Sequence, residues 1–285
     1  MKSTARILKM AGFNKTIWIN WFQGWENAPE ITDYCVQSWK HYNPDWNVVL
    51  LDRSNCMDYC DLEKQLPGLN PNNIALSDLL RASLLANNGG VWVDSTAFCN
   101  KPLDDWILDI KDSFFLTRGD QIFHIPTLPR VLENFFLAAR PDSYIFKTLY
   151  KRNIEHWKWR MESTDQFEHR YAMHNILLGE LLENDPKVRE IISSWDHIDV
   201  MHDNHLRTWG RSAHLLVPYH RSFTEQITPE FKNRIDSKID PFYKLTYKEG
   251  TAWRNKKQGG YHPDNERIPL QITKGSYVHY LLNTI

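Results

Sequence analysis

The sequence predicts an α/β fold in which a Rossmann-like mixed sheet is flanked by helices, with further helices in the second half of the chain. Three apolar segments, at 16–19, 46–51 and 91–93, have the length and the β-branched content of strands. Helical segments separate them, which favours parallel strands joined by right-handed crossovers. The 285 residues allow a sizeable core, and no repeat or linker divides them, so we expect one domain over 1–285.

The first crossover connects the first two of these strands. Asn27 is a candidate N-cap, and Pro29 suits the first turn of the helix that follows. Apolar residues then recur at helical spacing until Pro44, which ends the helix. A second helical segment is expected near 57–66.

The next helix carries leucines at helical spacing that would face a core: Leu76, Leu79, Leu80 and Leu84. Ser77 is its candidate N-cap. Asp78 and Arg81 lie three residues apart on another side of the helix, so both can reach one ligand. Gly89 and Gly90 end the helix, because glycine adopts a positive φ without steric cost.

The third strand brings Asp94 to its C-terminal end, and Ser95 and Thr96 follow. In open α/β sheets, ligands bind at the carboxyl ends of the strands. A carboxylate there, beside a helix that carries Asp78 and Arg81, suits a polyhydroxy ligand with a charged diphosphate.

The second half of the chain is expected to add two strands and several helices. The strands are predicted at 113–117 and 134–138. The helices are predicted at 142–159, at 167–182, at 188–195 after Pro186, and near 224–237.

Composition excludes several classes of protein. The net charge of −1 argues against a dedicated nucleic-acid binder. No apolar run approaches the length of a membrane span, and the N-terminus shows no hydrophobic signal core. The cysteines show neither a disulfide framework nor zinc-site spacing, so we expect free thiols in a reducing cytoplasm. They are Cys35, Cys56, Cys60 and Cys99.

The linked segments of this region resemble the sugar-binding region of glycosyltransferase family 32, whose pattern usually finishes in Asp-X-Asp. The form Asp-small-Thr is most similar to the capsular polysaccharide synthesis branch. The segments that carry the resemblance are Ser77-Asp78-Leu79-Leu80-Arg81 and Gly89-Gly90-Val91-Trp92-Val93-Asp94-Ser95-Thr96.

This resemblance implies a GT-A-type fold and the transfer of a hexose from a nucleotide-sugar to a hydroxyl of a glycan acceptor, with the anomeric configuration retained. The product would be a capsule or another surface polysaccharide, and the acceptor an oligosaccharide or a lipid-linked glycan. Residues 1–110 would then bind the nucleotide-sugar. Residues 111–285 would form the acceptor side and the C-terminal loops.

The resemblance also assigns roles to residues. Asp94, Arg81 and Asp78 would be catalytic, and the face of Trp21 would stack on the nucleotide base. Lys244 lies in a Lys-Leu-Thr-aromatic-Lys segment that is similar to one in the capsular branch, and it would hold the diphosphate. The full donor-binding set is Trp21, Ser77, Asp78, Arg81, Trp92, Asp94, Lys244 and Lys248.

Each role has a structural alternative. Trp21 is equally well explained as a core residue. Asp78 and Arg81 can form a solvent-exposed salt bridge, and Asp94 can cap a turn. The two lysines can belong to an exposed basic strand.

The resemblance implies a divalent metal, Mn²⁺ or Mg²⁺, with Asp94 and Thr96 as its ligands. A hydroxyl is a weaker, neutral ligand for a hard cation than a carboxylate. We therefore expect metal to bind loosely or not at all. In its absence cationic side chains must stabilise the leaving diphosphate.

Other polar residues allow weaker hypotheses. Arg254, Lys256 and Lys257 can form a basic loop over a diphosphate, or simply a solvated run. His197, His202 and His205 lack a fourth ligand at recognisable zinc spacing, which favours surface histidines. His279 lies late in the chain, where some GT-A enzymes supply a metal ligand.

Two other functions stay open. A non-catalytic glycan-binding or scaffold subunit with the same fold would explain the missing second acid at Thr96. A nucleotidyltransferase is less favoured, because no Gly-rich phosphate loop follows the first strand. We expect the protein to be cytoplasmic, with peripheral contact to the inner membrane face through Lys2, Arg6 and Lys9, unless this terminus is simply flexible.

Overall fold

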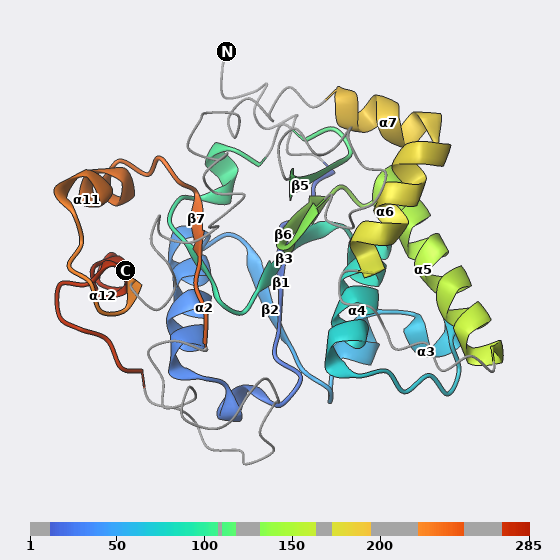
Figure 1. The fold of residues 1–285 in the computed structure, drawn as a ribbon, viewed down its shortest axis with the longest axis horizontal. Coiled ribbons are helices and arrows are strands. Elements are labelled where there is room, and N and C mark those ends of the chain that lie inside the picture. The colour runs from blue at the N-terminus through green and yellow to red at the C-terminus, as the bar shows by residue number, and fades with distance from the viewer. Residues whose placement is uncertain (1–11, 108–109, 118–131, 164–172, 195–221, 248–269) are drawn as a thin grey trace.

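The fold is built on two β-sheets with helices on both sides (Figure 1). The computed structural model describes residues 12–107, 110–117, 132–163, 173–194, 222–247 and 270–285. In this part of the chain a five-stranded sheet has the order β2-β1-β3-β6-β5, and a two-stranded sheet pairs β4 with β7.

The larger sheet is mixed, as the sequence predicts. β1 pairs in parallel with β2 and β3, whereas β6 is antiparallel to β3 and β5. Its strands are β1 (Thr16–Asn20), β2 (Asn47–Leu51), β3 (Gly90–Asp94), β5 (Ser113–Thr117) and β6 (Leu132–Ala139). All five were expected within a few residues of these bounds.

One face of this sheet is covered by helices that Figure 1 shows together on the right. Trp18, Trp92 and Leu137 point from the strands into this layer, because alternate residues of a strand face the same side. The helices are α3 (Leu62–Gln65), α4 (Asn73–Asn87), α5 (Tyr144–Glu162), α6 (Met173–Asn184) and α7 (Pro186–Ser193).

The opposite face packs on α2 (Glu30–Tyr42) and on the small sheet of β4 (Ala97–Cys99) and β7 (Phe242–Lys244). The intervening strand residues Ile17, Val91 and Phe136 face this layer. The rings of Phe136 and Phe242 stack 4.4 Å apart, so β7 is fixed directly on the large sheet. The sequence did not lead us to expect β4.

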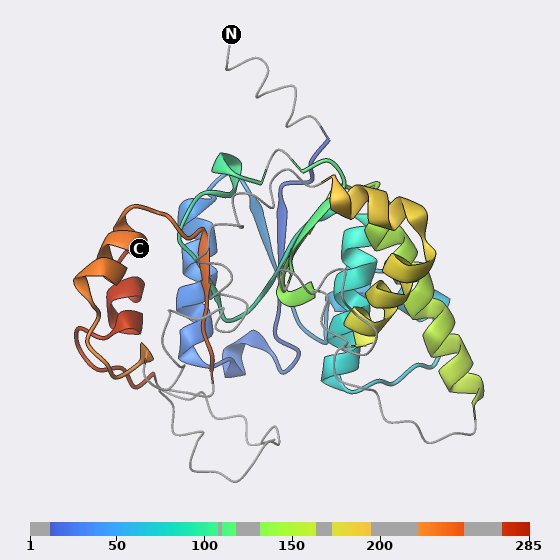
Figure 2. The ribbon, with the colours of Figure 1, turned by 45° about the horizontal axis from the view of Figure 1, so that its top comes forward.

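A further layer lies beyond the small sheet (Figure 2). Phe98 and Tyr243, at matched positions of β4 and β7, pack with α11 (Pro229–Asp236) and α12 (Tyr277–Leu282). α11 lies within the helix expected near 224–237, whereas α12 was not expected.

Two predicted helix caps are wrong. Asn27 closes a 3₁₀ turn (η1, Trp25–Asn27), and Pro29 itself is the N-cap of α2. Ser77 lies inside α4, which begins a turn earlier because the Asn72 side chain accepts the backbone N–H of Ala75 at 2.9 Å. The leucine stripe alone did not reveal this first turn.

Other boundaries differ in smaller ways. The helix expected near 57–66 is divided into a 3₁₀ turn (η2, Cys56–Tyr59) and α3. Another 3₁₀ turn, η3 (Leu103–Asp105), follows β4. Pro186 is the first residue of α7 and does not lie in a linker between two helices. The Asp185 side chain caps α7 directly before it. Of the segment at 167–182, only the part from residue 173 lies within the described residues.

The turn between α4 and β3 depends on two glycines. Gly89 and Gly90 have φ values of 67° and 95°. A Cβ on Gly90 would lie 2.6 Å from the carbonyl oxygen of Thr16, so a side chain would push β3 away from β1. The expected end of the helix at this pair is confirmed, and it sets where Asp94 emerges.

The four cysteines are free thiols, as expected. Burial raises the pKa of the Cys99 thiol to about 12, which keeps it protonated and unreactive. Across the described helices, none is both long and apolar enough to cross a bilayer.

Candidate active site

The carboxyl ends of the parallel strands form the candidate site. Asn20, the last residue of β1, is paired in register with Asp94, the last residue of β3. Trp21 follows directly and donates its backbone N–H to the carbonyl of Leu51, at the end of β2, at 2.8 Å. The strand ends therefore meet at one edge, where α/β sheets bind ligands.

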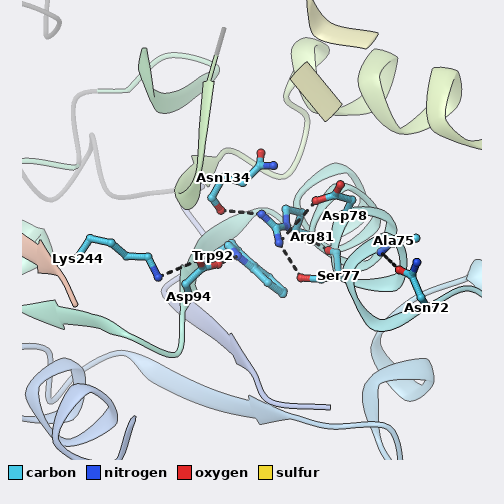
Figure 3. A network of polar contacts seen from close by, with 9 residues as sticks. All are labelled: Asn72, Ala75, Ser77, Asp78, Arg81, Trp92, Asp94, Asn134 and Lys244. Carbon is cyan, nitrogen blue, oxygen red and sulfur yellow. Dashed lines mark hydrogen bonds and ion pairs between the residues drawn. The ribbon is translucent and has the colours of Figure 1, made fainter. Parts of the chain in front are cut away.

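Arg81 is held from several sides (Figure 3). Its guanidinium donates to the Ser77 hydroxyl at 2.6 Å, to the Ser77 carbonyl at 3.1 Å and to the Asn134 carbonyl at 2.9 Å. The Asp78 carboxylate lies 3.7 Å away, and the ring of Trp92 lies 5.0 Å below the guanidinium carbon. The planar guanidinium can satisfy these partners at once, which an ammonium cannot.

The surface salt-bridge alternative for this pair is wrong. Only 8% of the Arg81 side chain and 6% of the Asp78 side chain are exposed. A charge buried to this degree needs a charged partner and hydrogen bonds. The two residues are each other's charged partner, and Arg81 also makes the hydrogen bonds given above. The pair is therefore held in place at the contact between α4 and β6.

Asp94 is more open, with 31% of its side chain exposed. One carboxylate oxygen accepts the indole N–H of Trp92 at 3.3 Å, and the other lies 3.2 Å from the Lys244 ammonium. No backbone N–H of the described residues donates to this carboxylate, so the structure does not support a turn-capping role. Through Trp92, Asp94 is also linked to Arg81 (Figure 3).

Lys244 reaches the site because β7 pairs with β4. Ala97 is in register with Lys244, and the backbone N–H of Leu245 donates to the Thr96 carbonyl at 2.7 Å. The ammonium donates to the Thr96 hydroxyl as well as contacting Asp94. Lys248, the other predicted lysine, lies outside the described residues.

The residues at Asp94 and Thr96 do not fit a resident divalent metal. Asp94 offers the one carboxylate of this pair, and the buried Thr96 hydroxyl accepts a hydrogen bond from an ammonium. Hard cations prefer several anionic or carbonyl oxygens, and Lys244 places a positive charge between the two side chains. Among the described residues, no three His, Cys, Asp or Glu side chains come together in a group that could hold a metal.

The part of the site around Trp21 contains donors that have no acceptor among the described residues. Within the described part of the chain, the buried indole N–H of Trp21 and amide N–H₂ of Asn20 make no hydrogen bond. The Trp21 ring meets the Tyr247 ring edge-on, 5.4 Å between centroids. Asn20 and Tyr247 were missed in the sequence. Their signal was position alone: Asn20 is the last residue of β1, and Tyr247 lies three residues after the end of β7.

Of the residues named in the weaker hypotheses, His279 lies within the described part of the chain. His279 lies on α12, which packs in the outer layer with Phe231 and Tyr243. The other residues of these hypotheses lie outside the described residues: the basic run of Arg254, Lys256 and Lys257, and the histidines His197, His202 and His205. So do Lys2, Arg6 and Lys9.

Comparison with known proteins shows the family. The family described as capsular polysaccharide synthesis protein matches residues 4–261, so the chain belongs to that family. This confirms the resemblance found in the sequence.

Curated relatives are glycosyltransferases that match part of the chain. The O-glycosyltransferase braB of Annulohypoxylon truncatum is 28% identical over 152 residues, which cover 48% of this chain and 36% of the relative. The initiation-specific alpha-1,6-mannosyltransferase of Saccharomyces cerevisiae is 25% identical over 174 residues, 52% of this chain and 35% of the relative. The aligned region thus spans little more than a third of the curated relatives' length.

A solved structure, the PaToxG glycosyltransferase, is similar over 84% of this chain and 91% of that one. Its TM-score is 0.39 and its sequence identity 14%. A likeness at that level supports no conclusion about activity.

Proposed function

We propose that this protein transfers a sugar from a nucleotide-sugar to a hydroxyl group of a glycan acceptor. The observation that carries the proposal is the strand-end carboxylate of Asp94 with a fixed cation on each side, Lys244 and, beyond Trp92, Arg81. A donor sugar presents hydroxyls and a diphosphate, which need these two kinds of partner. Family membership and the glycosyltransferase names of the relatives support it.

In this proposal each residue has a separate task. Asp94 accepts hydrogen bonds from hydroxyls of the sugar or ribose. When the bond from the anomeric carbon to the phosphate oxygen breaks, the electron pair stays on the diphosphate, and the positive charges of Lys244 and Arg81 stabilise it. Trp21, whose ring is half-buried, offers a face for the nucleotide base. Ser77 and Asp78 keep the Arg81 guanidinium in place.

The finer parts of the proposal rest on the family. They are a hexose as the transferred sugar, retention of configuration, and an oligosaccharide or lipid-linked acceptor in surface polysaccharide synthesis on the cytoplasmic side. The family description supports the polysaccharide product, and the other points rest on the resemblance in the sequence. Residues 1–110 supply most donor contacts in this proposal, with Lys244 and Lys248 as the contribution of 111–285. Neither Mn²⁺ nor Mg²⁺ is needed for the tasks given to these side chains.

The test is a screen of nucleoside-diphosphate sugars by thermal unfolding. A ligand at about 100 times its dissociation constant adds about 2.7 kcal/mol to stability. We expect at least one donor to raise the unfolding temperature of the wild type, and Asp94→Asn to lose that shift. A chain that no donor stabilises would contradict the proposal.

The hydroxyl of Thr96 at the position of a second acid favours one other function, a non-catalytic glycan-binding or scaffold subunit. The two are separated by incubating the protein with the stabilising donor and no acceptor. A transferase slowly hydrolyses its donor under these conditions, and Asp94→Asn removes the activity. A scaffold subunit releases no nucleoside diphosphate above the background of the variant.

A further inference from the structure

We propose that the Lys244 ammonium is the resident cation of this site and that it takes the position a divalent metal would need, so the donor diphosphate binds without metal. This inference rests on the proposed function for the identity of the ligand. Its geometry is independent of it: the ammonium lies between Asp94 and Thr96, 3.2 Å from the carboxylate and hydrogen-bonded to the hydroxyl. A metal shared by these two side chains would have to occupy the same space.

Charge balance supports the exchange. A divalent cation held by two carboxylates forms a neutral cluster. Within the described residues, the Lys244 ammonium and its carboxylate partner Asp94 are also neutral together, and the Thr96 hydroxyl adds no charge. A divalent metal held by Asp94 and Thr96 would leave a net charge of about +1, and Lys244 beside two carboxylates would leave about −1. The replacement of an acid by Thr96 and the replacement of a metal by Lys244 therefore belong together.

The pairing of β7 with β4 positions Lys244 and so restricts where its ammonium can lie. Lys244 is the last residue of β7, which pairs with β4 directly after Thr96, and the Leu245 N–H bonds to the Thr96 carbonyl. Two residues earlier, Phe242 is fully buried and stacked on Phe136. Only 16% of the Lys244 side chain is exposed. Folding has thus already restricted a side chain that is usually mobile, and ligand binding need not do so.

The same arrangement excludes a competing metal. The ammonium neutralises the Asp94 carboxylate and itself repels a divalent cation that comes within a few ångströms, so a metal gains little by binding here. A diphosphate that contacts the ammonium directly is attracted by its charge. The inference therefore predicts that introducing a carboxylate at Thr96 will not create a metal site while Lys244 is present, because the ammonium can pair with both carboxylates.

The experiment uses the full chain and five variants: Lys244→Met, Thr96→Asp, their double variant, Asp94→Asn, and Lys15→Met. Lys15 is the matched control, since its ammonium lies 2.8 Å from Asp104 with 27% of the side chain exposed, next to the opposite end of β1. Thermal unfolding first establishes that each variant is folded. Mn²⁺ alone and inorganic pyrophosphate in EDTA are then titrated by calorimetry.

We expect the wild type and Lys15→Met to bind pyrophosphate in EDTA and to show no Mn²⁺ site. Thr96→Asp should also show no Mn²⁺ site, but it should bind pyrophosphate more weakly than the wild type, because two carboxylates then share one ammonium. Lys244→Met should bind pyrophosphate at least tenfold more weakly. The double variant should gain Mn²⁺ affinity at least tenfold over the wild type, and its pyrophosphate binding should become dependent on Mn²⁺.

Four results would overturn the inference. They are Mn²⁺ binding by the wild type that Asp94→Asn removes, no pyrophosphate binding by the wild type, unchanged pyrophosphate affinity in Lys244→Met, and no gain of Mn²⁺ affinity in the double variant. Failure of the proposed function has a different signature: no nucleotide-sugar is bound or turned over, although the pyrophosphate and Mn²⁺ titrations follow the expected pattern.

Discussion

Two acid–base pairs flank Trp92, and they are built in opposite ways. Asp78 and Arg81 lie one helical turn apart on α4, with at most 8% of either side chain exposed, and the arginine makes further bonds to Ser77 and Asn134. Asp94 and Lys244 come from distant parts of the chain, and 31% of the aspartate side chain is exposed. The first pair is enclosed by protein, whereas the second faces the open edge of the sheet.

The difference assigns separate roles to the two pairs: Asp78 and Arg81 support the structure of the site, whereas Asp94 and Lys244 can contact the ligand. Removal of a buried arginine that is bonded on several sides lowers stability strongly. Arg81 therefore fixes the shape of its side of the site and supplies a constant positive charge. A carboxylate with one strong ionic partner and a half-open side chain can exchange contacts with a ligand at small cost. We therefore expect changes at Arg81 to affect stability first, and changes at Asp94 to affect donor binding and transfer with little effect on stability.

The largest effect should follow Arg81→Ala. Removal of the guanidinium leaves the Asp78 carboxylate buried without its cation, which costs about 3–5 kcal/mol of unfolding free energy. Urea denaturation measures it, and Arg81→Lys should recover only part of the loss. Donor binding should weaken in whatever fraction remains folded.

The control for this change is Arg152→Ala. Arg152 also pairs with a residue three positions away, Glu155, and with Glu180 of α6, but 42% of its side chain is exposed. Exposed pairs contribute less than about 1 kcal/mol. Equal losses for the two variants would show that burial does not distinguish the Arg81 pair.

Asp94→Asn should lower transfer at least about a hundredfold, or about 2.7 kcal/mol of activation free energy, and leave the unfolding free energy within about 1 kcal/mol. The variant keeps the shape of the side chain and loses its charge. Steady-state release of nucleoside diphosphate measures the first quantity, and urea denaturation the second.

Asp104→Asn provides a close match. Asp104 also pairs with a lysine, accepts an indole N–H, from Trp46 at 2.9 Å, and has 31% of its side chain exposed. It lies next to the other end of β1, so its variant should transfer sugar at nearly the wild-type rate. Similar kinetic losses in both variants would remove the special role of Asp94.

Tyr150→Phe tests the bonds of the Asp61 carboxylate, which also accepts the Ser83 hydroxyl of α4, the helix that carries Arg81. Burial alone would raise the pKa of the Asp61 carboxyl, but hydrogen bonds from Tyr150, Gln65 and Ser83 outweigh it and hold that pKa below its ordinary value. The Tyr150 hydroxyl donates at 2.6 Å and ties α5 to the start of α3. Its loss should cost about 1.5–3 kcal/mol near pH 7.

The pH dependence of this cost has a defined sign. A carboxyl whose pKa is lowered by folding contributes stability above its unfolded pKa of about 4, and the contribution is lost as pH falls through the folded value. The difference between wild type and Tyr150→Phe should therefore shrink below about pH 4. A difference that is constant from pH 7 to pH 3 would contradict the charge-assisted bond.

The smallest expected effect concerns the first turn of α4. Asn72→Ala should cost about 1 kcal/mol, because Asn72 is the N-cap of the helix that carries Arg81. Ser77→Ala leaves the cap intact and removes one bond to the guanidinium, so it should alter donor affinity as well as stability. A change in donor affinity with Asn72→Ala as large as that with Ser77→Ala would show that the two effects are not separate.

Much of the large sheet could be read from the sequence, since each of its strands is a short apolar run bounded by turn residues. The local pair on α4 could be read as well, because helical spacing places Asp78 beside Arg81. Its burial could not, since it depends on β6 closing over α4 through the Asn134 carbonyl.

The other side of the site was harder to predict. β4 is three residues long and β7 is equally short, so neither has a pattern of its own. The resemblance identified Lys244 as a diphosphate ligand, but only the pairing of these strands places its ammonium between Asp94 and Thr96. Asn20 carried no signal beyond its position at the end of β1.

The β4–β7 pairing also sets a time order for the assembly of the site. Lys244 is 148 residues from Thr96, whereas the strands of the large sheet are complete by Ala139. Contacts of long sequence separation form late, because the entropy of closing the loop must be overcome first. During synthesis, the sheet, Asp94 and Arg81 leave the ribosome well before β7 does. A nascent chain therefore displays the carboxylate before its counter-charge arrives, and the site becomes electrically neutral only in one of the last steps of folding.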